Sequence, residues 1–400
     1  MIRRILFWAH LVAGVIAGLA IGIMCFTGAA LAFEKDLVAW AERDARRVTV
    51  QADATRLPLA VLGEHVRAFA PDAKPLAITV AADPAAAVTF SLGRDHAVYA
   101  NPYTGEVRRP ASTRMHDFMH VMEDWHRWLA LGGDNRPIGK AINGACNLAF
   151  FFLAVSGLYL WWPRQFTWRS VKAVALFNGR LTGKARDFNW HNAIGLWTAP
   201  ILIVLTLTAV PISYRWATNT IYRMAGETPP VSPGPGGAAG PVVAVPPPPP
   251  GAKPLTHDAL LAAAAQAAPG WESLTLRLGS PNRGPRPGAT AAEAPATPPE
   301  RKGPQAVAVT VREPNAWPRT AATTLSLDPF TGDILRRESQ ADLSAARQIR
   351  GWMRYLHTGE ALGFWGQLVA GLASLGGCVL VYTGFALAWR RFVPAKQREG

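Results

Sequence analysis

Four long apolar runs alternate with two long polar segments along the chain. The runs cover residues 5–33, 141–162, 191–214 and 361–389, and none contains Asp, Glu, Lys or Arg. A helix needs about 20 apolar residues to cross the hydrocarbon core of a bilayer. We therefore predict transmembrane helices at 1–35, 138–163, 191–216 and within 341–392, where the last range begins with an interfacial segment.

Basic residues gather beside these runs on one predicted side of the membrane. Arg3 and Arg4 precede the first run, a basic loop at 164–190 joins the second to the third, and Arg390 and Arg391 follow the last. Segments rich in Lys and Arg stay in the cytoplasm. Both termini are then cytoplasmic, and the polar segments lie outside, in the periplasm if the membrane is a bacterial inner membrane.

Each polar segment has the pattern of a helix followed by antiparallel strands. The stretch "NPYTGEVRR" at 101–109 recurs as "DPFTGDILRR" at 328–337, and its Pro, Thr-Gly and acidic residue are typical of a turn between strands. We predict external α+β domains at 48–112 and 254–340. A Pro/Gly-rich linker at 226–253 and a disordered insert at 279–304, inside the second domain, are expected to be mobile.

Four histidines mark equivalent positions in two halves of the chain. His10 and His191 each follow a Trp closely and begin His-x-x-x-Gly, whereas His126 and His357 each begin His-x-x-x-Ala-Leu-Gly. His126 falls in a predicted interfacial helix at 113–137. Because both halves start on the same side, the pattern indicates a tandem duplication with parallel repeats, related by an axis along the membrane normal.

The histidines suggest a function. A buried imidazole within a helix bundle is costly unless it is paired or ligated, and facing imidazoles can supply both axial ligands of a haem iron. We predict a pair of His10 with His191 near the cytoplasmic side and a pair of His126 with His357 near the outer side, each holding one b-type haem. A single histidine at a helix end is more often an ordinary interfacial residue, but four at matching positions favour ligation.

Further histidines and the cysteines are less informative. His116 and His120 lie four residues apart on one predicted helix face, which suits either a metal ion, a third haem or a polar face near the lipid headgroups. Cys25, Cys146 and Cys378 lie inside apolar runs without a CxxC pair, so we interpret them as packing residues.

Composition supports a membrane protein. Half of the 400 residues are hydrophobic (50%) and only 17% are charged, which is few for a soluble chain of this size. The net charge of +14 does not indicate a nucleic-acid partner, because no basic helix with interleaved aromatic residues accompanies it. The lipid bilayer is the partner that composition predicts.

Several stretches together carry a family resemblance: "HRWLALGG", "LHTGEALGFWGQ", "SGLYLWWPR", "HNAIGLW" and the paired turns. On these motifs the chain resembles the PepSY-associated transmembrane proteins, iron-regulated inner-membrane proteins that include ferric-siderophore reductases. The resemblance covers nearly the whole chain apart from the linker and the insert. It implies a membrane protein with a four-helix transmembrane bundle built from two parallel repeats, and two external α+β PepSY-like domains. It also implies two b haems on His10, His126, His191 and His357, and reduction of a ferric siderophore in the periplasm for iron uptake.

Such an oxidoreductase needs a separate electron donor. No GxGxxG opens a βαβ unit, so we expect quinol or a cytoplasmic reductase to supply electrons, and we expect no acid/base catalytic group. One alternative is a non-enzymatic, membrane-anchored PepSY protein that binds or regulates a periplasmic peptidase or envelope partner. A transporter is a third hypothesis, although the four apolar runs contain no charged residue.

Overall fold

The structure is a computed structural model that describes residues 1–51, 53–93, 96–162, 167–230, 243–248, 250–278 and 304–393. Its contacts divide the chain into two compact units. The first contains Met1–Glu34, His116–Val231 and Ile349–Gly400, and the second contains Lys35–Met115 and Ser232–Gln348. The predicted insert at 279–304 lies outside the described residues except for Pro304, as does much of the linker at 226–253.

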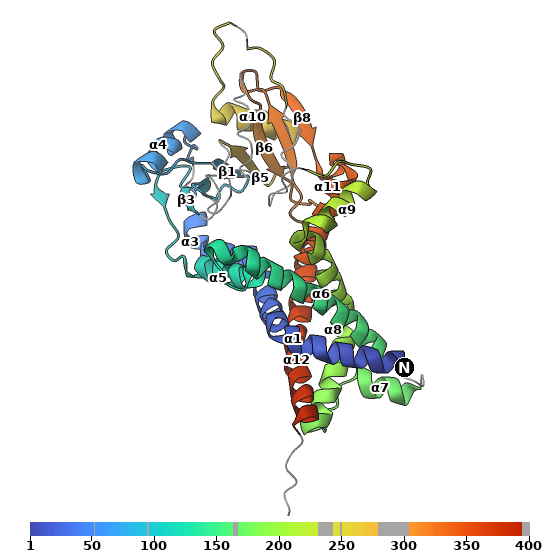
Figure 1. Ribbon diagram of the computed structural model, residues 1–400. Helices are drawn as coiled ribbons and strands as arrows, with labels where there is room; N and C mark the ends of the chain where they lie inside the picture. Colours follow the sequence, from blue (N-terminus) through green and yellow to red (C-terminus); the bar gives the residue numbers. More distant parts are fainter. Residues whose placement is uncertain are drawn as a thin grey trace, which may run out of the picture. The chain divides into compact units, whose positions relative to one another are not determined.

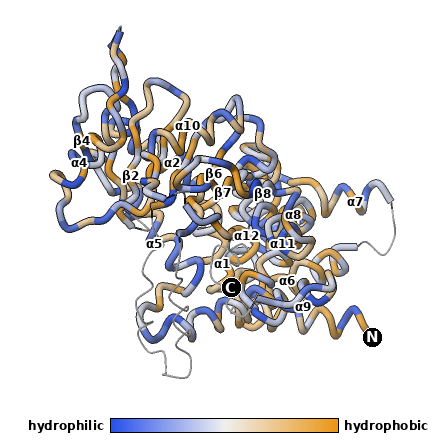
Figure 2. Tube along the Cα trace, turned by 90° about the horizontal axis from the view of Figure 1, so that it is seen from above, coloured by the Kyte–Doolittle hydropathy of each residue, from blue (hydrophilic) through white to orange (hydrophobic). Residues whose placement is uncertain are grey.

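Four long helices form the first unit: α1 (Ile2–Leu31), α6 (Arg136–Trp161), α8 (Gly183–Ser213) and α12 (Gly363–Phe392) (Figure 1). Each is long and apolar enough to cross a membrane, which confirms the four predicted spans, and the hydropathy of their residues can be followed in Figure 2. α1 and α8 each pack against both α6 and α12. The four helices therefore form a closed ring in which α1 and α8 stand diagonally opposite.

Small residues allow these helices to approach closely. A Cβ added at Gly18 of α1 would lie 2.7 Å from the ring of Phe385 in α12, and one at Gly377 of α12 would lie 2.5 Å from Cys25 Sγ. Glycine has no side chain, so it allows the backbones to approach closely, and such packing favours helix association in lipid. The three cysteines are free, in agreement with a packing role.

Shorter helices precede or follow the long ones. They are α5 (Arg114–Trp128), α7 (Trp168–Ala175), α9 (Arg215–Met224) and α11 (Ala345–His357), with 3₁₀ turns at Gly133–Asn135 and Glu360–Leu362. α5 comes before α6 in the chain as α11 comes before α12, which matches the predicted duplication. The helix predicted within 113–137 is thus present as α5.

The third long helix begins earlier than predicted. We expected it to start at residue 191, but α8 starts at Gly183 and takes in the end of the predicted basic loop. The Asp187 side chain is fully buried and pairs with Arg186 at 2.8 Å and with Arg390 of α12 at 2.7 Å. Because Arg390 neutralises it from another helix, the sequence near Asp187 gave no sign that this charged turn continues the helix.

The described residues of the second unit form one antiparallel sheet, a 3₁₀ turn at Gln340–Asp342 and the α-helices α2 (Glu34–Ala41), α3 (Arg43–Arg46), α4 (Leu59–Phe69) and α10 (His257–Ala267). The first four strands are β1 (Ala77–Ala81), β2 (Val88–Ser91), β3 (Ala97–Ala100) and β4 (Val107–Arg108). The last four are β5 (Ser273–Arg277), β6 (Val307–Arg312), β7 (Thr323–Leu327) and β8 (Ile334–Glu338). Their order in the sheet is β4-β3-β2-β1-β5-β6-β7-β8.

The two external segments are not separate domains, which corrects the sequence prediction. We expected one small sheet from 48–112 and another from 254–340, but β1 and β5 pair along their full length, from Ala77 opposite Arg277 to Ala81 opposite Ser273. Each four-stranded half would otherwise expose an edge with unpaired backbone groups. Pairing edge to edge satisfies those groups and gives one eight-stranded sheet.

The two halves of the sheet share one core and have matching turns. Side chains of α4 and α10, among them Leu62 and Leu261, pack with sheet residues in a single buried cluster. The two predicted turns are alike: Asn101 Oδ1 accepts a hydrogen bond from the Tyr103 backbone N–H at 2.9 Å, and Asp328 Oδ1 accepts one from Phe330 at 2.8 Å. Each turn ends on a glycine with positive φ, which only glycine adopts readily.

We expect a disulfide to form between the two halves when Thr79→Cys and Thr275→Cys are combined. These residues are directly paired across β1 and β5, and their hydroxyls lie 2.9 Å apart. Paired Cα atoms are about 4.5–5.5 Å apart, within the range of disulfides. Mass spectrometry of the oxidised protein should find the linked peptide. The control pair Thr89→Cys with Thr324→Cys should not link, because β1, β5 and β6 separate their strands; an absent link in the first pair would contradict the joined sheet.

Candidate functional site

The structure brings the four predicted histidines together in two pairs within the helical unit. His10 of α1 and His191 of α8 lie on the diagonal helices and are close enough for their rings to interact electrostatically. His126, near the end of α5, and His357, the last residue of α11, have ring centroids 6.2 Å apart and planes tilted by 48°.

In the first pair, each ring is oriented by a hydroxyl on a neighbouring helix. His10 Nδ1 lies 2.9 Å from Ser156 Oγ of α6, and His191 Nδ1 lies 2.9 Å from Thr383 Oγ1 of α12. The Thr383 hydroxyl donates its own proton to the Val379 carbonyl at 2.8 Å, and Ser156 donates to Leu153. With their protons directed to these carbonyls, the hydroxyl oxygens are placed to accept from Nδ1–H, the tautomer that leaves Nε2 of each ring with its lone pair.

In the second pair, backbone carbonyls orient the rings. His357 Nδ1 donates to the Leu205 carbonyl at 2.9 Å. His126 Nδ1 donates to the Met24 carbonyl at 3.1 Å and lies 3.0 Å from Thr27 Oγ1, whose proton goes to Ile23. A carbonyl only accepts, so both rings carry their proton on Nδ1. Metal-ligating histidines are held in this way, with one nitrogen bound to a carbonyl or similar acceptor and the other free for the metal.

Glycines border three of the four rings, and the closest approach is that of Gly28 to His126. A Cβ added at Gly157 would lie 3.4 Å from His10 Cε1, one at Gly384 would lie 3.6 Å from His191 Cε1, and one at Gly28 would lie 3.2 Å from His126 Cε1. Gly157 follows Ser156 in the chain and Gly384 follows Thr383. Each ring of the first pair thus lies against a Ser/Thr-Gly dipeptide whose hydroxyl contacts Nδ1.

The two pairs lie at different depths of the bundle. Fourteen residues of α1 separate His10 from Met24, which binds His126, and fourteen residues of α8 separate His191 from Leu205, which binds His357. At 1.5 Å per residue, both helices give a separation of about 21 Å along their axes. The equal spacing on α1 and α8 is consistent with the predicted duplication.

Burial keeps the second pair neutral. It lowers the pKa of His126 to about 4, and it also lowers the pKa of His357. An imidazolium loses hydration when it is buried, so the uncharged form is favoured at neutral pH. A neutral imidazole is the form that ligates a metal.

These residues fit a haem better than a bare metal ion. Among the described residues, no group of three or more His, Cys, Asp or Glu side chains could hold a metal. A pair of imidazoles suits an iron that brings four porphyrin nitrogens of its own. With metal–nitrogen bonds of about 2 Å and about 1 Å from nitrogen to ring centre, two axial imidazoles have centroids about 6 Å apart. The separation of 6.2 Å between His126 and His357 agrees with this.

The other histidines do not join these pairs. His116 and His120 on α5 have ring centroids 4.5 Å apart, but they belong to no larger ligand cluster in the part of the chain that the structure describes. His65 Nδ1 lies 2.8 Å from the Gly105 carbonyl oxygen of the first turn. His257 is exposed at the start of α10.

A family model for the PepSY-associated TM region matches residues 7–391. The chain belongs to the PepSY-associated TM region family. No curated protein matches the sequence significantly. The match begins before His10 and ends after Thr383 and Arg390, so all four histidines and the hydroxyls that orient the first pair lie within it.

Sequence reasoning missed the residues that orient the rings of this PepSY-associated protein. Ser156 and Thr383 occupy equivalent places in the two repeats, in "AVSGLYLW" and "VYTGFALAW". The repeated Ser/Thr-Gly was therefore visible as a signal. The carbonyls of Met24 and Leu205 left none, because every residue has a carbonyl and only the packing of α5 and α11 selects these two.

Proposed function

We propose that this PepSY-associated protein is a dihaem b electron-transfer protein of a bacterial inner membrane that reduces a ferric siderophore in the periplasm. The observation that carries the proposal is the common design of the two histidine pairs, in which Nδ1 is bound and Nε2 is left for a metal. Family membership and the four apolar helices support a membrane location for such a site.

The residues of the chain have distinct tasks in this function. His10 and His191 ligate one haem, and His126 and His357 ligate the other; a bound haem iron accepts and releases one electron at a time. Ser156, Thr383 and the two carbonyls fix the orientation of the rings. The apolar helices exclude water from the path, whose histidine levels lie about 21 Å apart along the helices. This separation spans much of the hydrocarbon thickness of about 30 Å.

The electron balance requires an external reductant. Each ferric ion takes one electron to become ferrous, so a two-electron donor serves two ferric ions. We propose quinol or a cytoplasmic reductase as that donor, with the termini and the 164–190 loop on the cytoplasmic side. Ferrous iron binds siderophores weakly compared with ferric iron, so reduction releases the metal for uptake.

An absorbance spectrum tests the proposal directly. Protein purified in detergent after growth with ample haem should contain about two b haems per chain, with sharp α bands after reduction by dithionite. The reduced protein should then be reoxidised by a ferric siderophore, with ferrous iron trapped by a chelator. A chain without haem would contradict the proposal and favour a non-enzymatic role for the external unit.

A further inference from the structure

One face of the eight-stranded sheet is rich in hydroxyl groups. Strand register places five threonines in one row across β2, β1, β5, β6 and β7. They are Thr89, Thr79, Thr275, Thr310 and Thr324. Their chain neighbours, such as Ile78 and Val309, are buried in the core beneath α4 and α10. Because side chains alternate along a strand, the threonines face the opposite side.

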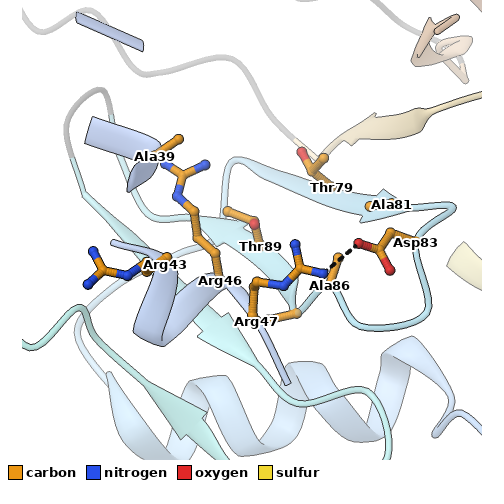
Figure 3. Close-up of a pocket in the computed structure, with 10 residues that line it drawn as sticks. Ala39, Arg43, Arg46, Arg47, Thr79, Ala81, Asp83, Ala86 and Thr89 are labelled. Atoms are coloured by element: carbon orange, nitrogen blue, oxygen red, sulfur yellow. Dashed lines mark hydrogen bonds and ion pairs between the residues drawn. The ribbon is translucent and has the colours of Figure 1, made fainter. Parts of the chain in front are cut away.

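A cavity of 350 Å³ lies at one end of this row, between the sheet and helices α2 and α3 (Figure 3). Thr79 and Thr89 line it from the strands, and Arg43, Arg46 and Arg47 line it from the helical side. Its remaining lining residues are Asp83 and four alanines, whose small side chains leave the space open. The volume is within the range of about 300–1,000 Å³ that small-molecule sites occupy.

The three arginines differ in how strongly they are held. Arg46 is fixed, since its Nε and Nη2 donate to Glu42 Oε2 at 3.0 and 2.7 Å, and the Tyr99 hydroxyl donates to the same oxygen at 2.8 Å. Arg47 contacts Asp83 at 3.4 Å, and both side chains are largely exposed. An exposed ion pair of this kind contributes little free energy, so a ligand can replace it.

Arg43 has no such carboxylate partner. Its guanidinium lies 4.7 Å from the ring centroid of Trp40 and donates to the Trp40 carbonyl at 2.8 Å. Within the described residues, no acidic side chain forms an ion pair with it. Arg43 and Arg47 therefore offer planar N–H donors to a ligand, beside the hydroxyls of Thr79 and Thr89.

We propose that this cavity binds an anionic ferric chelate through the carboxylate groups of its organic ligand. Guanidinium forks match carboxylates with two parallel hydrogen bonds, and such charge-assisted bonds are stronger than neutral ones. A ferric tris-hydroxamate chelate has no net charge and no free carboxylate, so it should bind Arg43 and Arg47 more weakly. That the ligand carries iron rests on the proposed function, whereas its negative charge rests on the cavity itself.

Titration calorimetry of the full chain in detergent tests the site with two gallium chelates. Gallium(III) is not reduced under these conditions, so binding is measured apart from electron transfer. Gallium citrate, which is anionic, should bind the wild type more tightly than gallium ferrichrome, which is neutral. Arg43→Gln combined with Arg47→Gln should weaken the binding of gallium citrate about 100-fold, because each lost charge-assisted contact costs about tenfold, or about 1.4 kcal/mol.

Controls separate the site from the function. Arg67→Gln, an exposed change on α4, should leave the affinity unchanged. The double variant should keep the haem content of the wild type, which shows that it is folded. If a chain with two haems binds gallium citrate equally well with and without the two arginines, the site is wrong and the function stands. If a chain without haem binds gallium citrate through these arginines, the site stands and the electron-transfer function is wrong.

Discussion

Replacing His357 by alanine should reduce the haem content from about two per chain to about one. The change removes one ligand of the outer pair and leaves His126 with no imidazole opposite it, while His10 and His191 are untouched. The remaining haem should keep its reduced α band, at about half the wild-type amplitude. Haem per chain, measured after extraction, gives the count.

Companion variants show whether the pairs are assigned correctly. His126→Ala should lose the same haem as His357→Ala, so the double variant should still contain one. His10→Ala and His191→Ala should each lose the other haem. His257→Ala, an exposed change outside the helical unit, should retain both. Two haems per chain in the His357→Ala protein would show that His357 is not a ligand.

Thr383→Val and Ser156→Ala should each lower the affinity for the inner haem, the one held by His10 and His191, about 10–100-fold. This is the usual effect of removing a group that orients a metal ligand. Valine keeps the shape of Thr383 but cannot accept a hydrogen bond from the His191 Nδ1–H. That hydrogen bond makes the ring a stronger electron donor, which favours ferric iron, so its loss should also raise the midpoint potential of the inner haem. Haem transfer to apomyoglobin measures the affinity, and redox titration measures the potential.

The conservative change and the outer haem provide the controls. Thr383→Ser retains a hydroxyl at the same position and should restore both affinity and potential. The outer haem should be unchanged in every one of these proteins, because its ligands bind to carbonyls of α1 and α8. An altered affinity without any change in potential would indicate that Thr383 only packs against the ring, contrary to the orienting role.

A charged cluster joins two helices of the bundle near His191. Asp187 lies four residues before His191 on α8, one helical turn away, and is held between Arg186 and Arg390. Arg390 lies seven residues after Thr383 on α12. The cluster therefore joins α8, which carries His191, to α12, which carries the Thr383 hydroxyl that contacts its ring. A buried carboxylate is tolerated here because two guanidinium groups compensate its lost hydration.

The sequence by itself determined the features that depend on periodicity and repetition. Long apolar runs predict membrane helices because a helix satisfies its backbone hydrogen bonds within the lipid, and the structure has a long apolar helix at each of the four predicted spans. The repeated Pro-aromatic-Thr-Gly stretches predicted matching turns, which Asn101 and Asp328 close with the same hydrogen bonds. The duplication also selected four histidines out of nine as candidates for one common role.

Only the tertiary structure decided which residues far apart in the chain meet. The pairing of β1 with β5 joins the edges of two four-stranded halves through backbone hydrogen bonds. Every strand edge has such groups whatever its side chains are, so the sequence does not indicate which edges pair. The start of α8 depends on Arg390, about 200 residues away, because its positive charge stabilises the buried Asp187 carboxylate. The carbonyls that orient His126 and His357 were likewise selected by packing, for every residue supplies the same acceptor and only its position in the bundle gives it a partner.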